Sequence, residues 1–233
     1  MIHVQRFTCI TLCMLMAACS SGSHMQEGRH APLSTNVNYV AHSPTWREQV
    51  QHAYARANAF VTQYAAAHPQ QSWAVIMDLD QTVLNNIEYH AAIDRAGKTH
   101  NETDWDAWTK ARRAVLMPHA RDFIARVKTL GGKVAFVTNR HSTQEVATEE
   151  NLAALGIVRG RDFQALLTHD ITNPSRDKNA RFARVPALLA AQGFHGTRVI
   201  AHVGDVMGDA PRPLGRTQFF CIPQGGLYGE NCK

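Results

Sequence analysis

Short, largely apolar runs recur along the chain from residue 73 onward, each briefer than an ordinary helix. The first, Trp73–Met77, contains no polar residue, and four others follow at 134–137, 163–167, 199–203 and 219–222. Runs of this kind are typical of buried parallel strands, because both faces of such a strand are covered. We therefore predict five strands that belong to one sheet.

Helical spacing of apolar residues fills the stretches around these strands. Between residues 46 and 64, apolar side chains recur three or four positions apart, and Thr45 with Glu48 has the spacing of a capping box. Shorter helical patterns follow at 119–130, at 142–155, where Ser142 and Glu145 repeat that spacing, and at 178–192. Helices alternating with strands indicate a three-layer, Rossmann-like α/β fold around a parallel sheet.

One connection is longer than this architecture needs. About 40 residues separate the first predicted strand from the helix at 119, and they include Tyr89, Trp105 and Trp108. Sites in α/β folds lie beyond the carboxyl ends of the strands. We therefore interpret residues 85–117 as a helical cap inserted over those ends, within a folded domain that spans 43–233.

The N-terminal segment has the pattern of an export signal. Residues 1–18 contain one Arg and no acid, and Phe7–Ala18 is an uncharged stretch, shorter than the roughly 20 residues of a spanning helix. This predicts a secretory signal peptide over 1–18. The ending at 15–19, LMAAC, resembles a bacterial lipobox, which implies lipidation of Cys19; an ordinary signal peptide with a chance cysteine is the alternative. Polar residues without a period over 19–42 predict a flexible tether.

Composition narrows the class of protein. Apolar residues make up 45% and charged residues 18%, which excludes disordered and low-complexity classes. The net charge of +5 comes without a Lys/Arg cluster, so nothing indicates a nucleic-acid partner. Beyond Cys19 only Cys221 and Cys232 remain, an even pair that suits a disulfide in an oxidising compartment. The scattered histidines lack the spacing of a structural zinc site.

Carboxylates follow the first predicted strand directly. Asp78 and Asp80 stand two residues apart, and alternate side chains of an extended chain point to the same side. Two carboxylates that face one pocket could supply a nucleophile and a proton carrier, and they favour a hard divalent cation. A helix N-cap with a spare acid is the structural alternative.

The later strand ends carry further candidate groups. Thr138 and Asn139 follow the second strand, where a hydroxyl and free backbone amides can bind phosphate, unless they form only a turn. Lys178 begins a helix and could neutralise a phosphoryl group, with Arg181 a weaker candidate one turn later. A solvated lysine is the alternative.

The fourth strand ends in Gly204 and Asp205. Asp205 could bind a metal ion, and Asp209 could pair with Lys178 or orient water, whereas a simple Asx turn is the alternative. An acid pair, a hydroxyl, a lysine and an acid thus follow one another at successive strand ends. In this order they resemble the four motifs of the haloacid dehalogenase superfamily.

Several stretches are similar to one family of that superfamily, the class C bacterial acid phosphatases, which are secreted or lipid-anchored. They are DLDQTVLNNIEY at 78–89, the pair Trp105 and Trp108, VTNR at 137–140, and KNARF at 178–182. The chain departs from the family pattern at Gln81, at 118–120, where Pro-His-Ala replaces Pro-Gly-Ala, and within 206–208.

The resemblance implies a HAD-like fold and Mg²⁺-dependent hydrolysis of phosphate monoesters, with nucleoside monophosphates (a 5′-nucleotidase activity) and aryl phosphates as substrates. Asp78 would attack phosphorus and form an aspartyl-phosphate, while Asp80 would protonate the leaving oxygen and then activate water. Mg²⁺ would be held by Asp78, Asp205 and the backbone carbonyl of Asp80. Three residues would bind phosphoryl oxygens: Thr138, Asn139 and Lys178.

A different function class stays open: a non-catalytic, surface-anchored binding lipoprotein on a degenerate phosphatase scaffold. Loss of Asp78 or Lys178 would support that hypothesis, and both residues are present. The lipobox, followed by the neutral Ser20, implies an exported protein anchored through Cys19 in the bacterial outer membrane.

Overall fold

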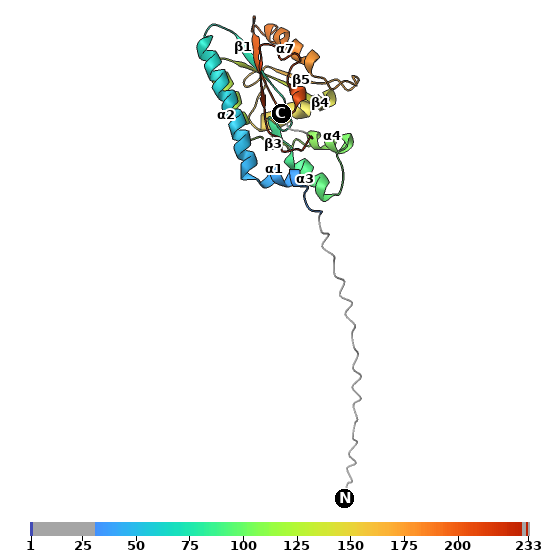
Figure 1. Ribbon diagram of the computed structural model, residues 1–233. Coiled ribbons are helices and arrows are strands. Elements are labelled where there is room, and N and C mark those ends of the chain that lie inside the picture. Colours follow the sequence, from blue (N-terminus) through green and yellow to red (C-terminus); the bar gives the residue numbers. More distant parts are fainter. Residues whose placement is uncertain (2–30, 230–231, 233) are drawn as a thin grey trace. The chain divides into compact units, whose positions relative to one another are not determined.

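The computed structural model describes residues 31–229 together with Met1 and Cys232 (Figure 1). The predicted signal peptide, Cys19 and residues 19–30 of the predicted tether lie outside the described residues. Within the described part of the chain, every helix is too short or too polar to span a bilayer.

A five-stranded sheet forms the centre of the domain, with every neighbouring pair of strands parallel. Its spatial order is β5-β4-β1-β6-β7. The strands are β1 (Trp73–Met77), β4 (Lys133–His141), β5 (Ala165–His169), β6 (Arg198–Gly204) and β7 (Gln218–Cys221). All five predicted strands are present, although β5 begins two residues later than its apolar run and ends on His169.

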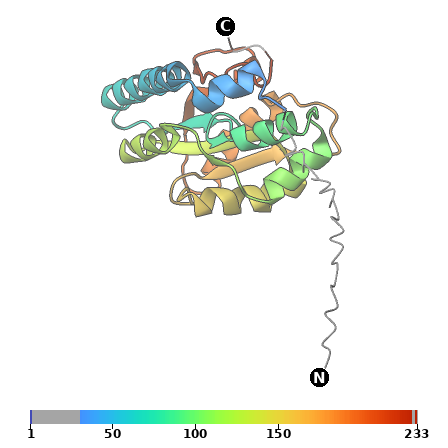
Figure 2. The same ribbon diagram turned by 90° about the horizontal axis from the view of Figure 1, so that it is seen from below.

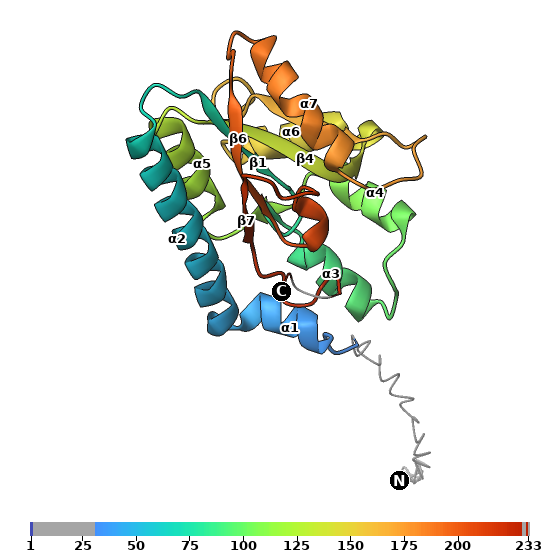
Figure 3. The ribbon, with the colours of Figure 1, turned by 45° about the horizontal axis from the view of Figure 1, so that its top comes forward.

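Helices cover both faces of this sheet, which confirms the three predicted layers (Figure 3). On one face, Val75 and Met77 of β1 join the core that includes α2 (Pro44–Ala67), α5 (Ala120–Thr129) and α6 (Glu145–Ala154). On the other face, the alternate residues Ala74 and Ile76 pack in a smaller core with α7 (Asn179–Ala190). Both faces of β1 are therefore buried, as its continuous apolar run requires.

Neither predicted capping box starts its helix. The α2 helix begins at Pro44, and the Ser43 hydroxyl accepts a hydrogen bond from the Trp46 amide at 3.3 Å. Proline suits this first position because its fixed φ is helical and its missing N–H would have no partner there. A 3₁₀ turn, η1 (Ser142–Gln144), precedes α6, and the Glu145 carboxylate instead accepts a bond from the Thr168 hydroxyl at 2.9 Å.

The predicted tether is wrong over its last residues. Thr35–His42 form the helix α1, in which Val37 and Val40 are buried. Two buried side chains are too few to hold so short a helix, so this helix depends on its other contacts with the rest of the fold. In particular, the Asn36 side chain donates a hydrogen bond to the Gly226 carbonyl at 2.9 Å.

The inserted cap lies where the long connection predicts it. Two short antiparallel strands, β2 (Leu84–Asn85) and β3 (Val115–Leu116), close its base. Between them stand α3 (Ile87–Arg95) and α4 (Glu102–Lys110). After the cap, His119 has a φ of +66°, in the left-handed region that favours glycine, which accounts for the usual Gly of the family pattern at this position.

A segment that follows β7, residues 222–229, is called here the closing loop. The disulfide between Cys221 and Cys232, whose Cα atoms are 5.9 Å apart, forms as predicted and brackets this loop. The loop runs beside α1 (Figure 2), and the Trp46 indole of α2 donates to the Pro223 carbonyl at 2.9 Å. The contact with α1 is close: a Cβ at Gly225 would come within 2.3 Å of a Val40 methyl group.

Candidate active site

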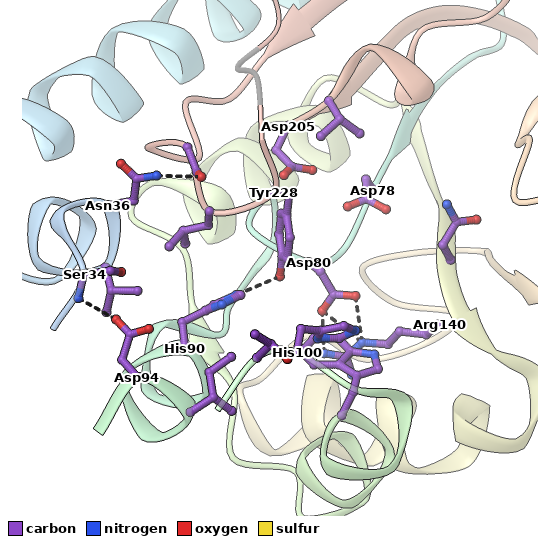
Figure 4. Close-up of a pocket in the computed structure, with 18 of the residues that line it drawn as sticks. Ser34, Asn36, Asp78, Asp80, His90, Asp94, His100, Arg140, Asp205 and Tyr228 are labelled. Carbon is purple, nitrogen blue, oxygen red and sulfur yellow. Dashed lines mark hydrogen bonds and ion pairs between the residues drawn. The ribbon is translucent and has the colours of Figure 1, made fainter. Parts of the chain in front are cut away.

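The candidate groups from three strand ends and one helix meet in a single cavity of about 560 Å³. It lies at the carboxyl edge of the sheet, where parallel strands bring their end loops together. Six predicted site residues line it: Asp78, Asp80, Asn139, Lys178, Asp205 and Asp209. Figure 4 shows Asp78, Asp80 and Asp205 around this space.

Lys178 lies between two carboxylates at the base of the cavity. Its ammonium group donates to Asp78 and, at 2.6 Å, to Oδ1 of Asp209. All three residues are buried. Burial by itself would lower the pKa of Lys178, but the charges of Asp78 and Asp209 raise the pKa above its ordinary value. The lysine therefore stays cationic.

The acids around Lys178 hold more negative charge than this one cation balances. Burial raises the pKa of Asp78 to about 7 despite the opposing effect of Lys178. Burial, with the charges of Asp78 and Asp209, also raises the pKa of Asp205 well above its usual range. A bound cation would offset this excess negative charge and so stabilise the ionised forms of Asp78 and Asp205.

The carboxylates of Asp78, Asp205 and Asp209 have one oxygen each within 4.8 Å of the others. Asp209 is already engaged, because its Oδ2 accepts from the amides of Asp205 and Val206 at 3.1 and 3.2 Å. Among the described residues, Oδ2 of Asp205 is buried without a partner. A buried, unpaired carboxylate oxygen beside other acids fits a hard divalent cation such as Mg²⁺.

Gly204 makes the Lys178–Asp209 contact sterically possible. The short turn η2 (Met207–Asp209) brings Asp209 back over Gly204, and a Cβ at residue 204 would lie 2.2 Å from the Asp209 Cβ. The altered residues 206–208 therefore still place Asp209 where Lys178 can reach it.

Asp80 is held by a partner that sequence reasoning did not assign. Arg140 is almost fully buried and donates from Nε and Nη2 to the Asp80 carboxylate, with a shortest distance of 2.7 Å. Asn86 adds a bond to Oδ1 of Asp80 at 2.9 Å, and the Gln81 side chain accepts from the Asn86 amide at 2.6 Å. Arg140 is the last residue of the VTNR stretch, and this was the only signal that could have pointed to it.

Thr138 lies behind the cavity wall and is fully buried. Its hydroxyl accepts a bond from the Arg140 amide at 3.1 Å, so its predicted contact with phosphate stays a prediction. Arg181 also lies outside the cavity lining. It contacts the Thr138 carbonyl and donates to the Asn139 side chain at 2.6 Å, and so orients Asn139 toward the cavity.

The outer end of the cavity is formed by the cap, α1 and the closing loop (Figure 4). Of the three cap aromatics, only Trp105 lines it. Tyr89 and Trp108 instead pack the cap, with hydrogen bonds of 2.9 Å to His100 and Asn86. His90 and Tyr228 are among the lining residues that the sequence reasoning missed.

His90 and Tyr228 face each other across this outer end. His90 Nε2 and the Tyr228 hydroxyl are 3.2 Å apart. Burial, with a smaller effect of His100, lowers the pKa of His90 to about 4, so the ring is neutral at pH 7. The contact is therefore a neutral hydrogen bond between the cap and the closing loop.

The chain is similar to several known proteins. The family model described as HAD superfamily, subfamily IIIB (acid phosphatase) matches residues 16–228. A stem 31 kDa glycoprotein of Glycine max is 28% identical over 160 residues, which cover 66% of this chain and 59% of that protein. Acid phosphatase 1 of Solanum lycopersicum is 26% identical over 141 residues, 58% of this chain and 50% of that protein.

The chain thus spans about half the length of the curated relatives it matches. Among solved structures, the class C acid phosphatase from Bacillus anthracis has the same fold, with a TM-score of 0.68 and 19% identity over 83% of this chain and 84% of that one. A tungstate-bound structure of that enzyme gives a TM-score of 0.66. The match of the family model over most of the chain shows that this protein belongs to the acid phosphatases of subfamily IIIB in the haloacid dehalogenase superfamily.

Proposed function

We propose that this protein hydrolyses phosphate monoesters, with Asp78 as the nucleophile. The observation that carries the proposal is the buried ion pair of Asp78 with Lys178, beside an Asp205 oxygen that lacks a partner within the described structure. Such a site places a nucleophile beside a fixed cation and leaves a carboxylate oxygen free to bind a second cation. Phosphoryl transfer requires this combination of positioning and charge neutralisation.

In the first step, an Asp78 oxygen forms a bond to phosphorus as the bond from phosphorus to the leaving oxygen breaks. Asp80 donates its proton to that oxygen. In the second step, Asp80 takes a proton from water, the water oxygen attacks phosphorus, and phosphate leaves with Asp78 restored. Lys178 neutralises charge on the phosphoryl oxygens, and Asn139 donates a hydrogen bond to them.

Mg²⁺ is the proposed cofactor, held by Asp78, Asp205 and the backbone carbonyl of Asp80. When bound, Mg²⁺ supplies positive charge against the phosphoryl group and the attacking carboxylate. The unpartnered Asp205 oxygen and the raised pKa values of Asp78 and Asp205 support this part of the proposal.

The proposed substrates are nucleoside monophosphates and aryl phosphates. The apolar and aromatic lining of the outer cavity, which includes Trp105, Leu227 and Tyr228, supports substrates with a sizeable planar leaving group. The proposed location is outside the cytoplasm, anchored by lipid at Cys19, and the Cys221–Cys232 disulfide suits such an oxidising compartment.

A colorimetric assay of phosphate release from p-nitrophenyl phosphate tests the activity. We expect turnover that EDTA removes and added Mg²⁺ restores, and none from Asp78→Asn, whose amide is a poor nucleophile. Full activity of Asp78→Asn, or of the chelated protein, contradicts the proposal, and absence of turnover favours a non-catalytic binding lipoprotein. For the location, Cys19→Ala should move the protein from the membrane fraction to the soluble fraction.

A further inference from the structure

Two histidines that are far apart in the sequence lie side by side where β4 and β5 end. His141 and His169 are the last residues of these neighbouring strands and are partners in the parallel register. Partner residues of adjacent strands direct their side chains to the same face of a sheet, and here the two imidazole centroids are 5.8 Å apart. Neither histidine lines the active-site cavity, so the pair takes no part in the proposed phosphoryl chemistry.

His169 uses one ring nitrogen in a hydrogen bond and leaves the other without a partner. Its Nε2 lies 3.0 Å from the Ser175 carbonyl oxygen, and because a carbonyl can only accept, Nε2 carries the proton and donates. In the neutral ring, Nδ1 then presents a lone pair. This nitrogen is buried and has no hydrogen-bond partner among the described residues, in a side chain that is only 6% exposed. A buried polar atom of this kind calls for a ligand.

The hydrogen bond of His169 is the one that a metal-binding histidine usually makes. Such a residue donates its second ring N–H to a backbone carbonyl or a carboxylate, which fixes the tautomer and directs the other nitrogen at the ion. Ser175 supplies that carbonyl from the loop between β5 and Lys178. Nδ1 is therefore ready to bind an ion without first losing a proton.

The spacing of the two rings fits one shared ion. A bond of about 2.1 Å from nitrogen to zinc places the ring centroid about 3.2 Å from the ion, so two rings at the tetrahedral angle have centroids about 5.2 Å apart. The observed 5.8 Å is slightly longer, and a small rotation of the partly exposed His141 ring would close the difference. The exposure of His141 also gives an ion a path from solvent.

We propose that His141 and His169 bind a divalent transition-metal ion such as Zn²⁺, at a site separate from the one proposed for Mg²⁺. Imidazole nitrogens suit Zn²⁺, Cu²⁺ and Ni²⁺, whereas carboxylate oxygens suit Mg²⁺. In the described part of the chain, the one group of three possible ligands is the acidic set of Asp78, Asp205 and Asp209. Water therefore completes the coordination at the histidine pair, which makes it an open, exchangeable site.

Calorimetric titration of Zn²⁺ into the full chain tests the site without any turnover, with Mg²⁺ in large excess to occupy the acidic site. We expect saturable Zn²⁺ binding that weakens about tenfold or more in His141→Phe and in His169→Gln. The glutamine amide can still donate to the Ser175 carbonyl, so the loop contact can persist. Asp205→Asn should bind Zn²⁺ as the wild type does, because its carboxylate belongs to the other site.

His202→Leu is the matched control. Nδ1 of His202 is likewise buried without a partner among the described residues, but the ring beside it belongs to Phe182, which offers no nitrogen. Its loss should leave the Zn²⁺ affinity unchanged. Nitrogen-15 NMR of the wild type then identifies the ligand atom, since Zn²⁺ should shift the Nδ1 signal of His169 while Nε2 keeps its proton.

The inference is overturned if both variants of the pair bind Zn²⁺ as the wild type does, or if His202→Leu loses as much affinity as they do. Loss of Zn²⁺ binding in Asp205→Asn, or an unshifted His169 Nδ1 signal at saturating Zn²⁺, would overturn it as well. If His169→Gln does not fold, His141→Phe still decides, because it changes a partly exposed side chain. Failure of the proposed phosphatase function would alter none of these measurements.

Discussion

The guanidinium group of Arg140 donates hydrogen bonds from Nε and Nη2 to the carboxylate of Asp80, on a segment 60 residues earlier in the chain. Arg140 also bonds to the Thr148 hydroxyl at 3.2 Å and is almost fully buried, so its position is set from both sides. This arrangement orients Asp80 toward the cavity and makes Arg140 a positioning residue for the proposed proton transfers.

Replacing Arg140 with Lys should therefore impair catalysis although the charge is kept. A single ammonium group cannot reproduce the paired bonds to Asp80, and misplacing a catalytic group by about 1 Å costs on the order of 10²-fold in kcat. Steady-state kinetics of Arg140→Lys check this, with KM expected to change far less than kcat. Wild-type kcat in a folded variant would contradict the positioning role.

Asp80→Asn should slow turnover by about 10²- to 10⁴-fold, the usual contribution of general acid–base catalysis. The amide can still accept bonds from Arg140, so the fold should persist, and circular dichroism provides that control. The loss should be smaller for p-nitrophenyl phosphate than for glycerol phosphate, because nitrophenolate leaves without needing a proton. An equal loss for the two esters would point to a structural effect instead.

Asp205→Asn should weaken Mg²⁺ binding, which can be measured without any turnover. A ligand that binds only the folded state adds about 2.7 kcal/mol of stability at a hundred times its Kd. Mg²⁺ should therefore raise the melting temperature of the wild type and have much less effect on Asp205→Asn. If both proteins respond alike, the cation binds elsewhere.

His202 should make stability depend on pH between about 4 and 6.5. Burial lowers the pKa of His202 from 6.5 to about 4, and its ring packs edge-on against Phe182. Between these values the unfolded chain is protonated and the folded one is not, so stability is complete above pH 6.5 and falls with pH. The loss attributable to His202 is about 3 kcal/mol at pH 4.

His202→Leu removes this titration, so denaturant unfolding at several pH values should show a flatter profile for the variant than for the wild type. His90, whose pKa is also lowered to about 4, contributes equally to both proteins and cancels in the comparison. Parallel profiles would contradict the prediction.

The strands and the acid pair could be predicted because their signals are local. A short, wholly apolar run such as Trp73–Met77 is stable as a strand in a sheet that is covered on both faces. Asp78 and Asp80 follow it in extended backbone, so their side chains point to the same side. Parallel strands then bring Lys178 and Asp205 to the same edge, wherever each strand stands in the sheet. The order β5-β4-β1-β6-β7 itself is not encoded in any single segment.

The remaining features depend on contacts between distant segments. Helix α1 has only two buried side chains, those of Val37 and Val40, and hydrogen bonds to the closing loop and the cap add to its stability. Tyr228 lies in a Gly-rich stretch without a period, so nothing local predicts that it reaches the cavity. Thr138 is wholly buried outside the cavity lining, whereas Asn139, the next residue of β4, lines the cavity, and no local pattern distinguishes the two.

Gly204 limits which residues of this segment can be substituted. Its φ is not in the left-handed region, so its backbone would accept any residue, and only the space taken by Asp209 forbids a side chain. Even alanine there would push Asp209 off Lys178 and leave the ammonium group with one counter-charge. Libraries that vary residues 206–208 can therefore be screened for altered activity, whereas variants that replace Gly204 should be inactive.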